Sequence, residues 1–139
     1  AVLSNVDDEE TFFYVTADEW ASSILKPTRH EEFFPHAKTV SKFKVKTKRF
    51  DTLIAEEKLD MLKYNVLVLD IQGGEYKALE GFGDYLWNFP VIVTEFFLAD
   101  LYEDIPLLSD LCNLLDDYDL KHPKEHFPLV GDAMFVRKK

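Results

Sequence analysis

Three polar side chains follow directly on two short apolar segments, and they are the residues best suited to carry chemistry. Asp70 and Gln72 come just after residues 66–69, and Glu95 ends the apolar run 91–94. A carboxylate in such a position accepts hydrogen bonds from a ligand amine or hydroxyl, and it acts as a general base when burial raises its pKa. The spacing leaves a second interpretation equally open, in which each carboxylate only caps the helix or turn that follows it.

The two apolar segments have the composition of strands in a sheet interior. Residues 66–69 read Val-Leu-Val-Leu and are too few for a free-standing helix, so we expect a strand buried on both faces. A helical pattern at 75–80 separates it from a second strand at 91–96, which predicts a right-handed βαβ unit with parallel, neighbouring strands. Such strands open at their carboxyl ends onto one crevice. Asp70 and Glu95 are therefore expected to face the same pocket.

Regular patterns also precede this unit. Residues 11–16 are β-branched and aromatic, and residues 40–50 alternate lysine with apolar residues, so we expect an antiparallel ribbon near the amino terminus. Between these two segments, residues 17–39 have no sustained period and are predicted to form a long loop with at most one helical turn. Asp51 is expected to cap a short helix that runs through about residue 63.

The last third of the chain contains the clearest amphipathic helix. Pro106 suits its first position. Its apolar side chains recur with helical spacing and should cover the sheet: Leu107, Leu108, Leu111, Leu114, Leu115 and Tyr118. Residues 118–121 and 132–137 are predicted to form a closing antiparallel pair joined by a loop. We expect residues 1–139 to form a single α/β domain.

Composition limits the classes of partner. The chain of 139 residues has a formal net charge of −10, which does not suit general binding of nucleic acid or of anionic membranes. No apolar run approaches the ~20 residues of a membrane span. Cys112 is the only cysteine, which is typical of a reducing compartment, and we expect a cytoplasmic protein. His122 and His126 are four residues apart, but Pro123 lies between them, so we expect no metal site there.

Two segments resemble the signature of FkbM-type methyltransferases, a branch of the class I S-adenosylmethionine-dependent enzymes. They are Leu69-Asp-Ile-Gln-Gly-Gly-Glu75 and Ala78-Leu-Glu-Gly-Phe-Gly83. They are similar to the family's run of Asp, a hydrophobe, Gln or Glu, Gly, a small residue and Glu, followed by a Leu-x-Gly turn. Weaker similarity extends over nearly the whole chain, including residues 91–95 and 131–136.

This resemblance implies a partial class I methyltransferase sheet, which is Rossmann-like. Its core strands are parallel, its carboxyl-terminal hairpin is antiparallel, and a β-ribbon is added near the amino terminus. It also implies transfer of a methyl group from S-adenosylmethionine, usually to a hydroxyl of a sugar or another small molecule. By position in the family, Asp70 and Glu95 would be catalytic, and Asp70, Gln72 and Gly73 would contact the cofactor.

The family's glycine-rich Asp-x-Gly-x-Asn loop has no counterpart in this sequence, so we expect the chain to be the carboxyl-terminal portion of a longer domain. Alone, it is expected to bind the cofactor weakly or not at all and to show no turnover. One alternative is a non-catalytic binding or assembly module that forms a homo-oligomer through an uncovered sheet edge. Another is an enzyme that uses Asp70, Glu75 and Glu95 with a divalent cation.

Overall fold

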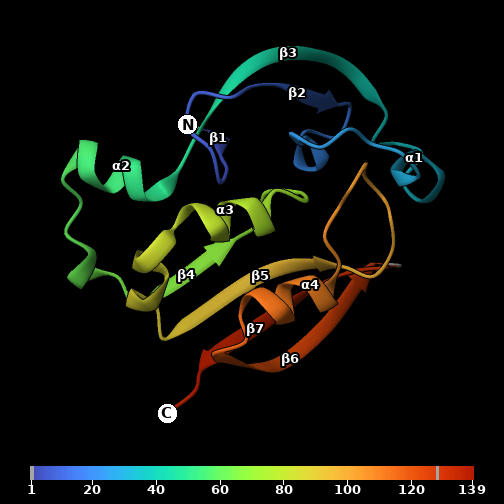
Figure 1. The fold of residues 1–139 in the computed structure, drawn as a ribbon. Coiled ribbons are helices and arrows are strands. Elements are labelled where there is room, and N and C mark those ends of the chain that lie inside the picture. The colour runs from blue at the N-terminus through green and yellow to red at the C-terminus, as the bar shows by residue number, and fades with distance from the viewer. Residues whose placement is uncertain (1, 128) are drawn as a thin grey trace.

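The computed structural model describes residues 2–127 and 129–139 and shows a mixed α/β protein with two small sheets (Figure 1). The first sheet has the strand order β1-β3-β2, and the second has the order β4-β5-β7-β6. Along the chain the elements are β1 (Val2–Leu3), β2 (Glu10–Thr16), η1 (Glu19–Ala21), α1 (His30–Phe33), β3 (Thr39–Lys48), α2 (Phe50–Glu57), η2 (Met61–Lys63), β4 (Val66–Leu69), α3 (Glu75–Gly81), η3 (Gly83–Asn88), β5 (Val91–Phe97), α4 (Leu108–Leu114), β6 (Tyr118–Phe127) and β7 (Val130–Arg137).

The first sheet is the antiparallel ribbon that alternation predicted, with a short third strand. β2 pairs with β3 from Glu10 opposite Lys46 to Thr16 opposite Thr39, and β1 pairs with β3 in parallel. The middle of this sheet is poorly covered, because Phe43 is 52% exposed, whereas Thr47 near β1 and Thr16 at the end of β2 are each 2% exposed.

Close contacts with α3 hold the first sheet against the rest of the protein. A Cβ at Gly81 would collide with the carbonyl oxygen of Ser4, so glycine allows β1 to approach the end of α3. The Asn5 side chain donates a hydrogen bond to Glu80 over 2.8 Å, and Arg49 donates to the Asn5 carbonyl over 2.8 Å. These contacts link the amino-terminal ribbon to the helix that follows β4.

The second sheet contains the expected parallel pair. β4 lies beside β5 in register, with Val66 opposite Val91 and Leu69 opposite Thr94. β7 pairs antiparallel with β5 and with β6. The prediction of two parallel, neighbouring strands joined through a helix is therefore confirmed, and the carboxyl ends of β4 and β5 lie side by side.

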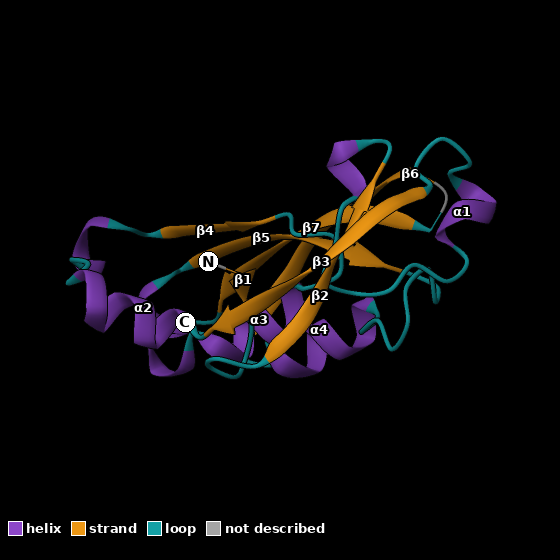
Figure 2. Cartoon of the chain, turned by 90° about the horizontal axis from the view of Figure 1, so that it is seen from above, coloured by secondary structure: helices purple, strands orange, loops and turns teal. Residues whose placement is uncertain are grey.

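One face of this sheet is covered by helices. Figure 2 shows α2, α3 and α4 along one side of β4 and β5. Leu111 of α4 is 2% exposed and belongs to one apolar cluster with Ile92, Phe96 and Phe135 of the sheet. Cys112 packs at the margin of this cluster, as expected for a small apolar side chain. None of the helices in the described part of the chain is long and apolar enough to cross a membrane.

The prediction that residues 66–69 are buried on both faces is wrong. Val66 is 49% exposed and Val68 is 66% exposed, whereas Leu69, on the helix side, is 5% exposed. The opposite face of the sheet, which we call the open face, carries Val66, Val68 and Met134. The helices α2, α3 and α4 lie on the other side of β4 and β5 (Figure 2). Within those residues β4 pairs only with β5, so its outer edge is free.

Two predicted boundaries on the helical side also need correction. The helix expected from Asp51 to residue 63 ends at Glu57, because Lys58 adopts a left-handed conformation with a φ of 52°. Arg49 occupies the N-cap position, and Asp51 lies inside α2, where it accepts hydrogen bonds from the Arg49 guanidinium. Pro106 precedes the first residue of α4 by two positions.

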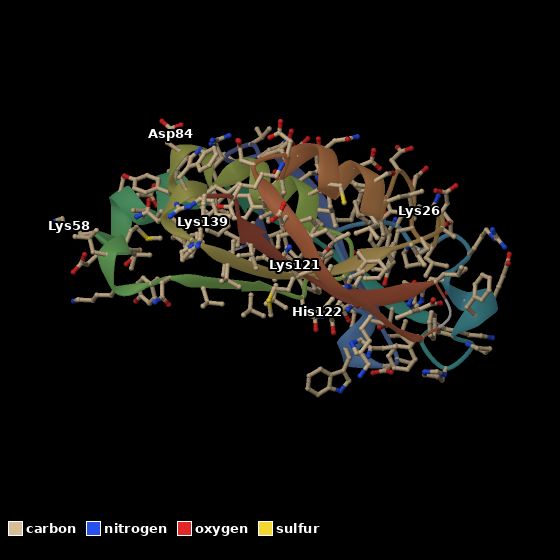
Figure 3. All side chains as sticks on the ribbon, turned by 90° about the horizontal axis from the view of Figure 1, so that it is seen from below. Lys26, Lys58, Asp84, Lys121, His122 and Lys139 are labelled. Atoms are coloured by element: carbon tan, nitrogen blue, oxygen red, sulfur yellow. The ribbon has the colours of Figure 1, made fainter. Side chains whose placement is uncertain are left out.

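The closing pair of strands is longer than predicted. β6 runs through the segment that we expected to be a loop, and its pairing with β7 shifts between Lys121 and Lys124. His122, which Figure 3 labels beside Lys121, has a φ of 49° at this irregularity. Proline has no backbone N–H to donate to a neighbouring strand. Because β6 is an edge strand, Pro123 breaks no hydrogen bond between strands on the solvent side.

Candidate functional site

The tips of β4 and β5 are joined by one amide side chain. Nε2 of Gln72 donates to Oδ1 of Asp70 over 3.0 Å and to the two carboxylate oxygens of Glu95 over 3.1 and 3.2 Å. Parallel pairing puts the two carboxylates at the same end of the sheet, and Gln72 reaches both from the turn after β4. The structure thus brings together three of the residues singled out from the sequence.

Glu95 is the most perturbed carboxyl group of this cluster. Burial, together with the neighbouring carboxylates of Glu75 and Asp70, raises the pKa of Glu95 to about 8, against the opposing effect of the hydrogen bond from Gln72. An ionised carboxylate is disfavoured in a poorly hydrated site that already holds negative charge. Glu95 is therefore mostly protonated at neutral pH. A carboxyl group with a pKa near the working pH is suited to proton transfer.

Glu75 is buried more deeply and has a local structural contact. It is 3% exposed, and its Oε1 accepts a hydrogen bond from the Ile71 N–H over 2.8 Å. Burial raises the pKa of Glu75 to about 7. Because Glu75 is the first residue of α3, this contact fixes the turn between β4 and the helix.

Gln72 itself is held by the loop that precedes β3. The Ser23 hydroxyl donates to the Gln72 carbonyl over 2.6 Å, and Ser23 also pairs with Tyr14 at the end of β2. Gln72 has a φ of 55°, in the left-handed region that a non-glycine residue adopts only when its surroundings hold it there. The loop and the β4–α3 turn therefore position each other.

Gly73 lies under apolar side chains. Its φ is 96°, and a Cβ at this position would lie 2.9 Å from Leu25 Cδ1 and 3.1 Å from Ile105 Cδ1. Glycine is required here both by the backbone conformation and by the close packing. The structure consequently places Gly73 beneath Leu25 and Ile105.

A cavity of about 380 Å³ opens beside Gln72 and Glu95. Its other walls come from the loop between β2 and β3 and from the ends of β5, β6 and β7. The lining residues are Asp18, Trp20, Ala21, His30, Phe34, His36, Ala37, Gln72, Glu95, Phe97, Phe127 and Val130. Sequence reasoning missed the loop residues, since a segment without periodicity gave only the prediction of a loop. Its concentration of aromatic and histidine side chains was the available signal.

The acidic residues do not form a metal-binding group. Across the part of the chain that the structure describes, no three His, Cys, Asp or Glu side chains are arranged to hold an ion. The Glu75 carboxylate is already engaged by the backbone of the adjacent turn. This geometry does not favour the divalent-cation alternative.

Comparison with known proteins identifies a family. The family model of the methyltransferase FkbM domain matches residues 2–121, a range that includes Asp70, Gln72 and Glu95. No curated protein and no solved structure gives a significant match.

Proposed function

We propose that the tips of β4 and β5 form the acceptor side of an S-adenosylmethionine-dependent O-methyltransferase site, because the chain belongs to the methyltransferase FkbM domain family. The acceptor would be a hydroxyl group of a small molecule. The observation that carries this proposal is the bridge that Gln72 makes between Asp70 and Glu95 at the edge of the cavity. It supports the proposal because methyl transfer to a hydroxyl needs a positioned group that accepts the proton, beside an enclosed site for the molecule that carries the hydroxyl.

In this proposal Glu95 is the general base. Its ionised form accepts the proton of the acceptor hydroxyl while that oxygen takes the methyl group. Gln72 orients the Glu95 carboxylate, since it donates to both of its oxygens. With a pKa of about 8, the ionised fraction of Glu95 rises through the neutral range, so the rate should increase with pH up to about 8.

S-Adenosylmethionine, when bound, supplies the methyl group. Asp70 is exposed, and its carboxylate suits the ammonium group at the methionine end of the cofactor. The Gln72 amide adjoins this carboxylate, whereas Gly73 contributes the shape of the turn. The described residues fit only this end of the cofactor, because they include no Asp-x-Gly-x-Asn loop.

The free edge of β4 supports a longer domain in which further strands complete a Rossmann-like sheet. An unpaired strand edge and exposed apolar side chains at Val66 and Val68 are unfavourable in water. The alternative is a second copy paired at the same edge. Sedimentation velocity of the 139-residue chain separates the two: a concentration-independent monomer counts against the self-association alternative.

The test is methyl transfer by the protein translated from its complete reading frame. Tritium from methyl-labelled S-adenosylmethionine is followed into a panel of sugars and phenols, with Glu95→Gln as the variant. We expect Glu95→Gln to lower transfer by about 10²-fold or more, because the base is lost, and to leave the affinity for S-adenosylhomocysteine within about threefold. Equal transfer by both proteins would contradict the role of Glu95. Absence of transfer with every acceptor would contradict the proposed reaction.

A further inference from the structure

Aromatic side chains line the cavity at the tips of β4 and β5. Trp20 and Phe34 come from the segment between β2 and β3, and Phe127 ends β6. The ring centroids of Phe34 and Phe127 are 5.9 Å apart and the ring planes are inclined at 86°, so these two rings form nearly perpendicular walls. Phe127 is 61% exposed and Trp20 is 89% exposed, so both rings remain accessible to a ligand.

This arrangement of rings is suited to a positively charged ligand. The face of an aromatic ring carries partial negative charge and attracts a cation, most strongly when the ring is that of tryptophan. Several rings around one space are a common means of recognising a quaternary ammonium group. The methyl groups of such a ligand also bury apolar surface against the rings.

Asp18 supplies a partly exposed carboxylate to the same cavity. Its Oδ1 accepts a hydrogen bond from the Trp20 backbone N–H over 3.3 Å, which holds the carboxylate close to the tryptophan. Its Oδ2 lies 3.7 Å from Nε2 of His36, and the two side chains form an ion pair only when the imidazole is protonated. The side chains of Asp18 and His36 are 35% and 69% exposed, so a ligand cation can reach the carboxylate and displace His36.

The other charged groups of the cavity also favour a cation. Glu95 lines a more buried wall, where burial and the carboxylates of Glu75 and Asp70 raise its pKa to about 8. A positive charge beside Glu95 would offset this repulsion and stabilise the ionised carboxylate. Burial lowers the pKa of His30, so its imidazole is neutral at neutral pH, and none of the described lining residues is a lysine or an arginine. An anionic ligand would therefore be repelled, whereas a cation would meet two carboxylates.

We infer that this cavity binds an organic cation that carries an alkylated ammonium group. The ammonium group lies against the rings of Trp20, Phe34 and Phe127. Asp18 and ionised Glu95 provide the opposite charges. The inference rests on the proposed function only in so far as the same molecule carries the acceptor hydroxyl. The sulfonium group of S-adenosylmethionine shares this chemistry, so the test includes the cofactor as a competitor.

The test compares choline with 3,3-dimethylbutanol, which has nearly the same shape and no charge. Each is titrated into the 139-residue chain labelled with fluorinated tryptophan and followed by ¹⁹F NMR at pH 9, where Glu95 is mostly ionised. The chain has two tryptophans, so the signal that remains in Trp87→Phe identifies Trp20. Trp87 is not among the residues that line the cavity, and its signal serves as an internal reference.

We expect choline to shift the Trp20 signal with a dissociation constant in the millimolar range and to bind about fivefold or more tightly than 3,3-dimethylbutanol. Equal affinities, or no shift with choline, would overturn the inference. Displacement of choline by a tenfold lower concentration of S-adenosylmethionine would assign the rings to the cofactor and would also overturn it.

A charge variant tests the carboxylate. Asp18→Asn keeps the oxygen that accepts from the Trp20 N–H, and we expect it to weaken choline binding about threefold or more without changing the affinity for 3,3-dimethylbutanol. The matched control is Asp60→Asn. Asp60 accepts a hydrogen bond from the Leu62 N–H over the same 3.3 Å, but it does not line the cavity, so choline binding should not change. Equal effects of the two substitutions would contradict a role for Asp18.

A second variant tests the aromatic face. Trp20→Leu keeps an apolar side chain at an exposed position, so the fold should be unaffected. Binding is then followed by saturation transfer to the methyl signal of choline. We expect the affinity for choline to fall about threefold or more, because leucine has no ring face. Unchanged affinity would contradict the proposed position of the ammonium group.

The binding experiments are independent of methyl transfer. Choline binding that depends on Asp18, without transfer in the complete protein, supports the cation site and contradicts the proposed reaction. Transfer in the complete protein, together with equal affinities for choline and 3,3-dimethylbutanol, supports the reaction and contradicts the cation site. The two proposals therefore fail separately.

Discussion

Replacing Glu95 by glutamine should change how the stability of the chain depends on pH. The folded state keeps the Glu95 proton up to a pKa of about 8, whereas the unfolded state releases it near the ordinary value of 4.5. The stability associated with this proton is fully present below 4.5 and is lost as pH rises through 8. Between pH 5 and pH 9 this loss amounts to at most about 4 kcal/mol of unfolding free energy. Because Glu95 is coupled to Glu75, we expect a measured loss of about 2–4 kcal/mol.

Glu95→Gln keeps the shape of the side chain and cannot ionise, so its free energy of unfolding should fall less steeply with pH. Burial lowers the pKa of His30, and that group adds stability with rising pH below about 6.5. His30 is present in both proteins, so its contribution cancels in the difference between them. The measurement is urea denaturation at intervals from pH 5 to pH 9.

A matched control removes an exposed carboxylate. Glu57→Gln, at the end of α2, should follow the wild-type curve because its side chain lies in water. Wild-type and Glu95→Gln curves that run parallel over the whole range would refute the reasoning, since they would mean that Glu95 ionises as freely in the folded protein as in the unfolded one.

Three further predictions concern packing and cofactor affinity. Gly73→Ala should lower the free energy of unfolding by about 2 kcal/mol in urea denaturation, because the added Cβ meets Leu25 and the φ of Gly73 is positive. The control Gly83→Asn, at a φ of 53°, should lower it by less than about 1 kcal/mol. Equal losses would contradict the packing argument. Leu111→Ala should lower the free energy of unfolding by about 2–5 kcal/mol, whereas Leu62→Ala, at a side chain that is 93% exposed, should change it by no more than about 0.5 kcal/mol. A small loss at Leu111 would mean that α4 does not cover the sheet. Calorimetry of the 139-residue chain with S-adenosylhomocysteine should show no micromolar affinity, and such affinity would mean that these residues already hold the cofactor.

The strands and the leucine helix could be predicted because their signals are local. Alternation identified β3, apolar runs identified β4 and β5, and helical spacing identified α4. The burial of β4 could not be predicted, since four apolar residues do not show which face another element covers, and Val68 is exposed on the open face. The extension of β6 through Pro123 depends on its place at the sheet edge, which only the strand order reveals.

The site was predictable only in part for a similar reason. The approach of Asp70 and Glu95 follows from parallel pairing of neighbouring strands. The bridging position of Gln72 depends on its positive φ and on a hydrogen bond from Ser23, 49 residues earlier. Trp20, His30 and Phe34 of the cavity lining come from the segment between β2 and β3, which has no periodicity and whose conformation is set by contacts distant in sequence.

The claim on which the account depends is that Glu95 is largely buried beside Asp70 and Gln72. The most direct test is a ¹³C NMR titration of the glutamate side-chain carboxyl groups in the 139-residue chain, with Glu95 assigned by its loss in Glu95→Gln. The account predicts a titration midpoint for Glu95 near 8. A midpoint near 4.5 would contradict it, because Glu95 would then be a hydrated carboxylate remote from the other two.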